Sequence, residues 1–219
     1  MAVGDAVRVL DARSSRILAA VEDVWRAIQA RHPDVPSVIV TLGAGTETTA
    51  LRLGHFCPGA WAAGTLTLGE VFLAGEGLRA PAEDVLDTLL HEAAHGMCDV
   101  RNIHDTSRGG RYHNRRFRAA AIELGLECTQ AGTAGWSDTR LRPATVALWG
   151  PQLAQLREAI TAWRQTETAP NRLGAGRPSN NNGAVLTCGC GRRIRVAPSI
   201  ADLGPIWCGL CRQAFQPRA

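Results

Sequence analysis

Residues 81–100 have the sequence PAEDVLDTLLHEAAHGMCDV, and this segment is the best guide to the fold of the whole chain. Proline is favoured in the first turn of a helix, and the negative charges of Glu83 and Asp84 are favourable at a helix N-terminus. Apolar residues then follow at helical spacing and cover much of the circumference. We therefore expect one largely buried helix from about Pro81 to Val100.

Within this expected helix, residues 91–95 are HEAAH. His91 and His95 lie four residues apart, on one helical face, where both imidazoles can bind one metal ion. Glu92 follows the first histidine directly, so its carboxylate can accept a proton from a zinc-bound water. The alternative is a helix with two solvated or capping histidines. The apolar surroundings favour a zinc site, because buried histidines need partners.

A catalytic zinc ion usually has three protein ligands and one open position. His104 and His113 lie nine and eighteen residues after His95, and Glu123 and Glu127 are the acidic alternatives. We favour His113, because a second helix expected to begin there would share its inward face with this residue. His104 stands in a polar run and is the weaker candidate.

The groups around the ligands can also be anticipated, because a metal-bound histidine generally donates its second N–H to a carboxylate or carbonyl. Asp87 is four residues before His91, and Asp99 is four residues after His95. Ordinary surface carboxylates remain the alternative for both. Tyr112 could stabilise an oxyanion, although a packed tyrosine is the simpler interpretation.

The remaining pattern predicts an α+β domain. Apolar residues at helical spacing predict a helix over Ser14–Ala30. Three strands are expected over Ser37–Leu42, Leu51–Trp61 and Thr65–Leu73, which are apolar or β-branched and separated by glycine or proline. Pro143–Thr166 is helical again, with a possible break at Pro151.

Four of the seven cysteines fall in the last 32 residues, as Cys188-x-Cys190 and Cys208-x-x-Cys211. Two close thiolate pairs suit one tetrahedral structural zinc, which would stabilise a module too small to fold on its core alone. The alternative is a reduced, disordered tail with coincidental cysteines. The single cysteines are expected to be small core residues: Cys57, Cys98 and Cys128.

Three segments follow from these patterns. Residues 1–167 form the metal-binding domain with a helical extension, and residues 184–219 form the cysteine module. Residues 168–183 are rich in proline, glycine and asparagine without periodicity, which is typical of a flexible linker.

Charge and composition narrow the partners only slightly. The formal net charge is +4, and all 24 basic residues are arginine, which biased codon usage explains most simply. A secretory-type start and a long apolar run are both missing from the sequence. We therefore expect a cytoplasmic protein without a membrane partner, and its oligomeric state is left open.

Two groups of arginines suggest nucleic acid as a partner. Between and beside the cysteine pairs stand basic and aromatic residues that could contact phosphates and stack on bases: Arg192, Arg193, Arg195 and Trp207. A second group precedes and begins the second helix: Arg108, Arg111, Arg115, Arg116 and Arg118. For both groups a solvated surface is the alternative, and we favour it for most of the second group.

Residues 90–98 and 105–117, with HEAAH, His113 and Phe117 in the order H-x-x-x-F, resemble the SprT-like metallopeptidases. The resemblance covers about residues 14–126, and many members also have a C-terminal zinc ribbon. It implies a zincin-like unit made of a helix, a small β-sheet, the HExxH helix and a helix that carries the third ligand. One departure is Asn114, where the family often has glycine. The loop before His113 is also somewhat longer than in Spartan-type members.

The resemblance implies a zinc metalloendopeptidase, with zinc on His91, His95 and His113 and with Glu92 as the base. Some members digest proteins crosslinked to DNA, so a protein substrate and DNA are the implied partners. Two other hypotheses remain open: a protease whose protein substrate is unrelated to DNA, and a non-catalytic zinc protein that binds nucleic acid. The intact Glu92 argues against the last, because a structural zinc site would not need it.

Overall fold

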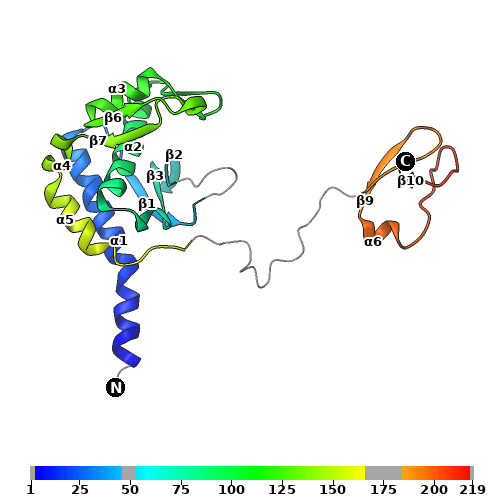
Figure 1. Ribbon diagram of the computed structural model, residues 1–219, viewed down its shortest axis with the longest axis horizontal. Coiled ribbons are helices and arrows are strands. Elements are labelled where there is room, and N and C mark those ends of the chain that lie inside the picture. The colour runs from blue at the N-terminus through cyan, green and yellow to red at the C-terminus, as the bar shows by residue number, and fades with distance from the viewer. Residues whose placement is uncertain (1–2, 46–52, 166–183, 218–219) are drawn as a thin grey trace. The chain divides into compact units, whose positions relative to one another are not determined.

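A computed structural model describes residues 3–45, 53–165 and 184–217 of the chain (Figure 1). The chain divides into two compact units, Met1–Thr166 and Glu167–Ala219, which we call the N-terminal and C-terminal units. The predicted linker, residues 168–183, lies outside the described residues, so its flexibility stays a prediction. Within the described residues, no helix is long and apolar enough to cross a membrane.

Helix α2, Ala82–Val100, occupies the core of the N-terminal unit and confirms the helix predicted from the HEAAH segment. Buried side chains extend around most of its circumference: Val85, Leu86, Leu89, Leu90, Ala93, Ala94 and Met97. Gly96 permits a close approach, since a Cβ atom there would lie 2.9 Å from Cδ of Pro36. The helix is therefore held on several sides at once, which fixes the direction of the side chains it carries.

Helix α1, Val3–Arg31, packs an apolar stripe against the same core. It contains the predicted helix but begins eleven residues before Ser14. The stripe follows helical spacing: Ile17, Val21, Val24, Trp25 and Ile28. The indole N–H of Trp25 donates to the carbonyl oxygen of Pro36 at 3.0 Å, which ties the helix to the segment before the first strand.

Three strands form a sheet in the order β1-β3-β2, which are Val38–Gly43, Leu66–Ala74 and Gly54–Ala63 in that order. Strand β1 is parallel to β3, and β2 is antiparallel to β3. The three predicted strands are confirmed, with boundaries shifted by one or two residues where the structure describes them; the first two residues of the predicted Leu51–Trp61 strand lie outside the described residues. Strand β2 is an edge strand whose register shifts between Cys57 and Trp61. This edge strand packs against α2.

The segment after α2 forms two short strand pairs with a helix between them. Strand β4, Thr106–Ser107, pairs with β5, Tyr112–His113, and β6, Leu126–Thr129, pairs with β7, Asp138–Leu141. Helix α3, Arg115–Glu123, lies between β5 and β6 in the chain. These four strands are too short to leave a periodic signal, and none of them was predicted.

His113 lies in β5 and not in the helix, so its predicted helical position is wrong. The cause is Asn114, which is the N-cap of α3. Its Oδ1 accepts hydrogen bonds from the backbone N–H of Arg116 at 2.7 Å and of Phe117 at 3.3 Å. An N-cap residue has extended backbone, so the helix begins only after it and the preceding residue remains extended.

Two further helices complete the N-terminal unit: α4, Pro143–Leu148, and α5, Gly150–Ala159. The predicted break in this helical region is present, but it falls at Trp149, and Pro151 stands in the first turn of α5. The second helix also ends before the predicted Thr166. Figure 1 shows α5 beside α1, and this pair closes one side of the core with buried Trp149, Leu153 and Leu156. Single turns of 3-10 helix occur at Gly77–Arg79 and Gly132–Ala134.

The C-terminal unit is a small sheet with long connections. Strands β8, Ala184–Thr187, β9, Arg193–Val196, and β10, Gln216–Pro217, pair antiparallel in the order β10-β8-β9, and α6, Pro198–Ala201, is one turn long. Among the described residues of this unit, the buried side chains are Leu186, Cys188 and Cys208. The chain is therefore a mixed α+β protein, and the part of its second unit that the structure describes has almost no core of its own.

Candidate metal centres

Three imidazoles converge on one point in the N-terminal unit. His91 and His95 extend from α2, and His113 extends from β5. The Nε2 atom of His113 lies 3.3 Å from that of His91 and 3.1 Å from that of His95. One ligand atom from each of the three lies within 4.8 Å of the others, so the group could hold a metal ion. We call these three residues the histidine centre.

Phe117 forms the floor of the histidine centre. Its ring centroid lies 4.6 Å from the centroids of all three imidazoles, and its side chain is 0% exposed. It stands in the first turn of α3, where the cap on Asn114 fixes the start of the helix. The phenyl ring therefore supports the three ligands from beneath and excludes water from that side.

Two of the imidazoles have a direct partner for their second nitrogen. Nδ1 of His95 lies 2.5 Å from Oδ2 of Asp105, and Nδ1 of His113 lies 3.3 Å from the carbonyl oxygen of Ala134. A carboxylate and a carbonyl accept hydrogen bonds, so each Nδ1 carries the proton and each Nε2 carries a lone pair. Gly135 follows Ala134 at φ 72°, and a Cβ there would lie 2.2 Å from the carbonyl oxygen of His113, so only glycine fits.

The third imidazole reaches a carboxylate through a hydroxyl group. Nδ1 of His91 lies 3.2 Å from Oγ1 of Thr139 on β7, and that hydroxyl donates to Oδ2 of Asp87 at 2.9 Å. Burial raises the pKa of Asp87 to about 6. Burial, and then the neighbouring His95 and His113, lower the pKa of His91, which keeps this imidazole neutral and able to bind a metal.

The orientation of the three rings leaves lone pairs facing one another. With a proton on every Nδ1, the short Nε2 contacts at 3.1 and 3.3 Å oppose lone pairs and are repulsive unless a cation lies among them. Two nitrogens bound to one tetrahedral zinc ion at about 2.0–2.1 Å would lie roughly 3.3 Å apart. The donor set and its spacing therefore fit such an ion.

Glu92 lies next to this point on α2 and is 6% exposed. Its Oε1 would be 3.3 Å from a Cβ atom placed on Gly54, so the glycine allows β2 to pass close to the carboxylate. Glu92 lines the same cavity as the three histidines. A buried carboxylate beside a metal-bound water has the position that a general base requires.

The histidine centre stands in the wall of a cavity of about 710 Å³, which we call the metal cleft. Four parts of the chain line it besides α2: the start of β2, residues 103–106, Gly110 with His113, and residues 137–139. The cleft is open to solvent at its rim, where His104 is exposed. It therefore has room for an extended substrate beside the three imidazoles.

Several sequence candidates have other partners in the structure. His104 lies on the rim but is not part of the three-histidine group. Glu123 receives two hydrogen bonds from Arg101, at 2.7 Å each. Asp99 lines the cleft, but the carboxylate on His95 is that of Asp105, which we did not predict.

Tyr112 is engaged away from the cleft. The guanidinium of Arg108 lies 5.0 Å from its ring centroid, and the side chains described as lining the cleft do not include it. In the same region the guanidinium of Arg118 lies 4.4 Å from the ring centroid of Trp136. The packed tyrosine that we gave as the simpler interpretation therefore fits this structure better than an oxyanion donor does.

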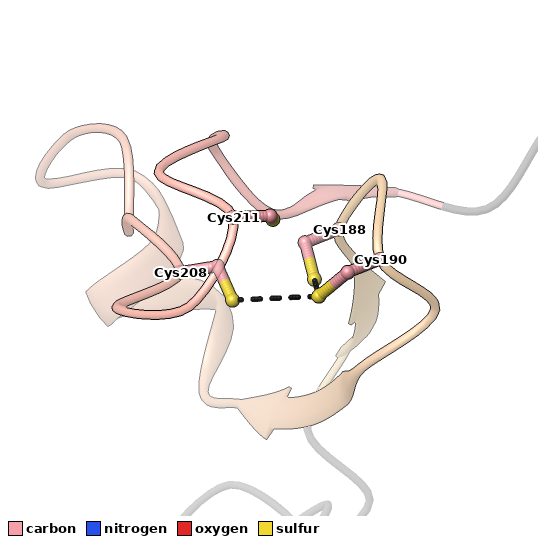
Figure 2. A group of neighbouring side chains, drawn as sticks. All are labelled: Cys188, Cys190, Cys208 and Cys211. Atoms are coloured by element: carbon pink, nitrogen blue, oxygen red, sulfur yellow. Dashed lines mark hydrogen bonds between the residues drawn. The ribbon is translucent and has the colours of Figure 1, made fainter.

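Four cysteines converge in the C-terminal unit, and Figure 2 shows them facing one another from two loops. The Sγ atoms of Cys188 and Cys190 are 3.2 Å apart, and those of Cys190 and Cys208 are 3.8 Å apart. Together with Cys211, all four Sγ atoms lie within 4.8 Å of one another, so this group could also hold a metal ion. We call it the cysteine centre.

Backbone N–H groups favour the thiolate form at two of the four cysteines, Cys208 and Cys211, whereas the neighbouring thiol of Cys188 raises the pKa of Cys190 to about 12. The backbone N–H of Cys188 donates to the carbonyl oxygen of Arg192, and Gly191, at φ 80°, closes the turn between them. Hydrogen bonds from the backbone N–H groups of Cys211 and Leu210 lower the pKa of Cys208 to about 6. The two turns thus present sulfur atoms toward one point, as metal-binding knuckles do.

The remaining cysteines and the basic residues have mixed outcomes. Cys98 is buried and Cys128 half-buried, but Cys57 is exposed on edge strand β2, so its predicted core position is wrong. In the C-terminal unit the side chain of Trp207 is 64% exposed. It is therefore available for stacking and is not packed beneath the cysteine centre. The basic side chains of β9 and the turn before it are exposed as well: Arg192, Arg193 and Arg195.

Comparison of the chain with protein families, with curated proteins and with solved structures found no match. The class of protein must therefore be inferred from the two centres themselves.

Proposed function

We propose that the chain is a zinc-dependent endopeptidase of the SprT-like class. In this proposal His91, His95 and His113 hold the zinc ion. The observation that carries the proposal is the convergence of three Nε2 lone pairs at the wall of an open cleft. Beside them stands a buried carboxylate, that of Glu92.

The choice of zinc follows from the type and number of donors. Three imidazole nitrogens with one side open to a cleft are typical of catalytic zinc sites. Imidazole also binds copper, iron and nickel, but the carboxylate directly after the first ligand is the feature of hydrolytic zinc sites. The four thiolates of the cysteine centre suit a second, structural zinc ion.

The proposed reaction is hydrolysis of a peptide bond. A bound zinc ion supplies a water of lowered pKa and polarises the scissile carbonyl. Glu92 accepts the proton of the attacking water and transfers it to the leaving amine. Phe117 excludes water from beneath the ligands, and Asp105 holds His95 in the tautomer that directs Nε2 toward the reaction centre.

The substrate is proposed to bind along β2. This strand is one of the two edge strands of the sheet in the described residues, and Gly54, Phe56 and Pro58 line the cleft from it. An extended peptide can add to such an edge through main-chain hydrogen bonds, which requires no particular side-chain sequence. A polypeptide chain in extended conformation is therefore the proposed substrate.

DNA is proposed as a partner on a separate observation. Trp207 is 64% exposed in a unit that also presents Arg192, Arg193 and Arg195 to solvent. Aromatic stacking together with phosphate contacts is the usual mode of single-strand binding. A protease directed to proteins on DNA follows if both centres act together. Four cysteines gathered as a metal site are typical of a reducing compartment, so a cytoplasmic location remains part of the proposal.

The test is cleavage of a DNA-binding protein by the zinc-loaded chain, with and without single-stranded DNA. The Glu92→Gln variant, which keeps the shape and loses the base, is the control. Cleavage that requires Glu92 and DNA supports the full proposal, and cleavage indifferent to DNA supports a protease with another protein substrate. Binding of DNA by a zinc-loaded chain that cleaves nothing would favour the non-catalytic alternative.

A further inference from the structure

Asp87 is an acidic side chain on α2 that the proposed reaction does not use. Its Oδ2 accepts the hydroxyl proton of Thr139 at 2.9 Å. Its Oδ1 is buried and has no hydrogen-bond partner among the described residues. A buried carboxylate with one unsatisfied oxygen destabilises a fold, because the charge loses its hydration. Its presence here calls for a compensating role.

The position of Thr139 indicates that role. A threonine hydroxyl has one proton, and Asp87 accepts it, so the oxygen turns a lone pair toward Nδ1 of His91 at 3.2 Å. That nitrogen must then carry a proton, which leaves the lone pair of His91 on Nε2. Nε2 is the atom that faces His113 at 3.3 Å.

The same chain of hydrogen bonds acts electrostatically and mechanically. The negative charge of Asp87 polarises the Thr139 hydroxyl, and the hydroxyl polarises the imidazole, so Nε2 of His91 becomes a stronger donor to a cation. Asp87 belongs to α2 and Thr139 to β7, so the link also fixes β7 beside the histidine centre. His95 and His113 have direct acceptors instead, in Asp105 and the carbonyl of Ala134.

We propose that Asp87 and Thr139 are positioning residues that hold His91 in its metal-binding tautomer and orientation and thereby raise the metal affinity of the histidine centre. The metal-free fold is less stable because of the Asp87 carboxylate. The inference rests on the metal site of the proposed function and not on peptidase activity.

Four variants of the full chain separate this role from general packing. Thr139→Val keeps the shape and removes the hydroxyl, whereas Thr139→Ser keeps the hydroxyl. Asp87→Asn keeps the shape and an acceptor and removes the charge. The matched control is Thr88→Val, which makes the same change next to Asp87, on the same helix and in the wall of the same cleft. The Thr88 hydroxyl donates to the carbonyl oxygen of Asp84 at 2.9 Å and so belongs to a different hydrogen bond.

The affinity of each variant is measured by competition of a chromophoric chelator for zinc, and cobalt is then used as a spectroscopic probe. Thiolate-to-cobalt charge-transfer bands report the cysteine centre, so that centre is an internal reference. We expect Thr139→Val and Asp87→Asn to weaken binding at the histidine centre by about 10- to 100-fold. The Thr139→Ser and Thr88→Val variants should remain within about threefold of the wild type.

Two further measurements decide the mechanism. In the double variant that combines Asp87→Asn with Thr139→Val, the loss of metal affinity should be about as large as the larger of the two single losses. Both changes break one chain of hydrogen bonds, so their effects do not add. Metal-free Asp87→Asn should melt at the same temperature as the metal-free wild type or higher. Additive losses, an affinity of Thr139→Ser as low as that of Thr139→Val, or a lower melting temperature of metal-free Asp87→Asn would each overturn the inference.

The outcome is also distinguishable from failure of the proposed function. Normal metal binding with the expected affinity differences, but without cleavage of any protein, supports the positioning role and counts against the peptidase. A wild-type chain that binds no metal at the histidine centre would overturn both.

Discussion

The histidine centre and the cysteine centre are built on very different amounts of protein. Two residues of the histidine centre lie on α2, which is surrounded by buried side chains, and the ring of Phe117 packs beneath the centre. Each of its imidazoles has a hydrogen-bond partner. The described part of the C-terminal unit buries only Leu186 and two residues of the cysteine centre, Cys188 and Cys208. A site on a packed core is formed before the metal arrives, whereas a site that supplies most of its own core is formed by the metal.

The largest effect expected from this difference is that removal of the metal unfolds one unit and not the other. A chelator should unfold residues 184–217 almost completely, because a structural zinc site contributes on the order of 10 kcal/mol to such a module. Residues 53–165 should stay folded, because their apolar core does not depend on the metal. Hydrogen exchange measured by mass spectrometry, with and without chelator, reports both units in one sample.

Two controls sharpen that experiment. Cys208→Ser should reproduce the unfolding of the C-terminal unit without chelator, and His113→Ala should leave both units folded while the histidine centre loses metal. Loss of protection across α2 on chelation would break the comparison, because the histidine centre would then also depend on its metal for folding.

The second effect concerns the partner of His95. Replacing Asp105 by Asn removes the negative charge that orients this ligand, so the zinc affinity of the histidine centre should fall by about 10- to 100-fold. The affinity of the cysteine centre should not change. The corresponding control is Asp99→Asn, which removes a carboxylate from the same cleft wall; an equal loss in this variant would mean that bulk charge and not orientation is responsible.

The sequence was sufficient to predict the helices and strands that are long enough for their apolar residues to repeat several times. The helix around HEAAH, the helix containing Ser14–Ala30 and the three strands of the sheet all have repeated apolar residues, and packing agrees with the pattern. His91 and His95 are four residues apart on one helix, so their proximity is a local property. The cysteine pairs are local in the same sense, and only the closure of one pair on the other needed the fold.

The rest of the histidine centre depends on contacts that no local pattern encodes. Thr139 lies 48 residues after His91, and the two meet only because β7 packs beside α2. Asp99 has the helical spacing expected of a partner for His95, but the loop after α2 folds back and places Asp105 there instead. His113 does join the other two histidines, but the reason given for it was wrong, since Asn114 caps α3 and the helix begins two residues later than expected, at Arg115.

The third effect is a pH dependence that distinguishes the two units. Burial raises the pKa of Asp87 to about 6 in the folded protein, above its ordinary value of 3.8, so the folded metal-free protein binds this proton more tightly than the unfolded chain. The resulting loss of stability is full at pH 7 and is recovered as the pH falls through 6 toward 4. The metal-free Asp87→Asn variant should therefore be more stable than the wild type by about 2–3 kcal/mol at pH 7, and the two should be close to equal near pH 4.

Denaturant unfolding of the metal-free proteins at both pH values tests this difference. The comparison of variant with wild type removes the opposing contributions of carboxylates whose pKa is lowered, among them Glu83, Asp105 and Glu123. A stability difference that does not change with pH would show that the Asp87 carboxylate is not destabilised by burial. The zinc-loaded C-terminal unit should respond in the opposite direction, because acid protonates its thiolates and releases the metal.

The smallest effect concerns Asn114, which has two roles at the start of α3. Its Oδ1 caps the helix beneath the histidine centre, and its Nδ2 donates to the carbonyl of His104 at 2.8 Å. Asn114→Ala should lower the free energy of unfolding of the N-terminal unit by about 1 kcal/mol, because the cap is lost, and Asn114→Ser should lower it less, because serine retains a capping oxygen. Thermal unfolding of the metal-free variants measures both. Neither variant can form the hydrogen bond to the carbonyl of His104. Equal losses for alanine and serine would therefore mean that this bond contributes more than the cap. The rim of the cleft, and not the start of the helix, would then hold His113 in place.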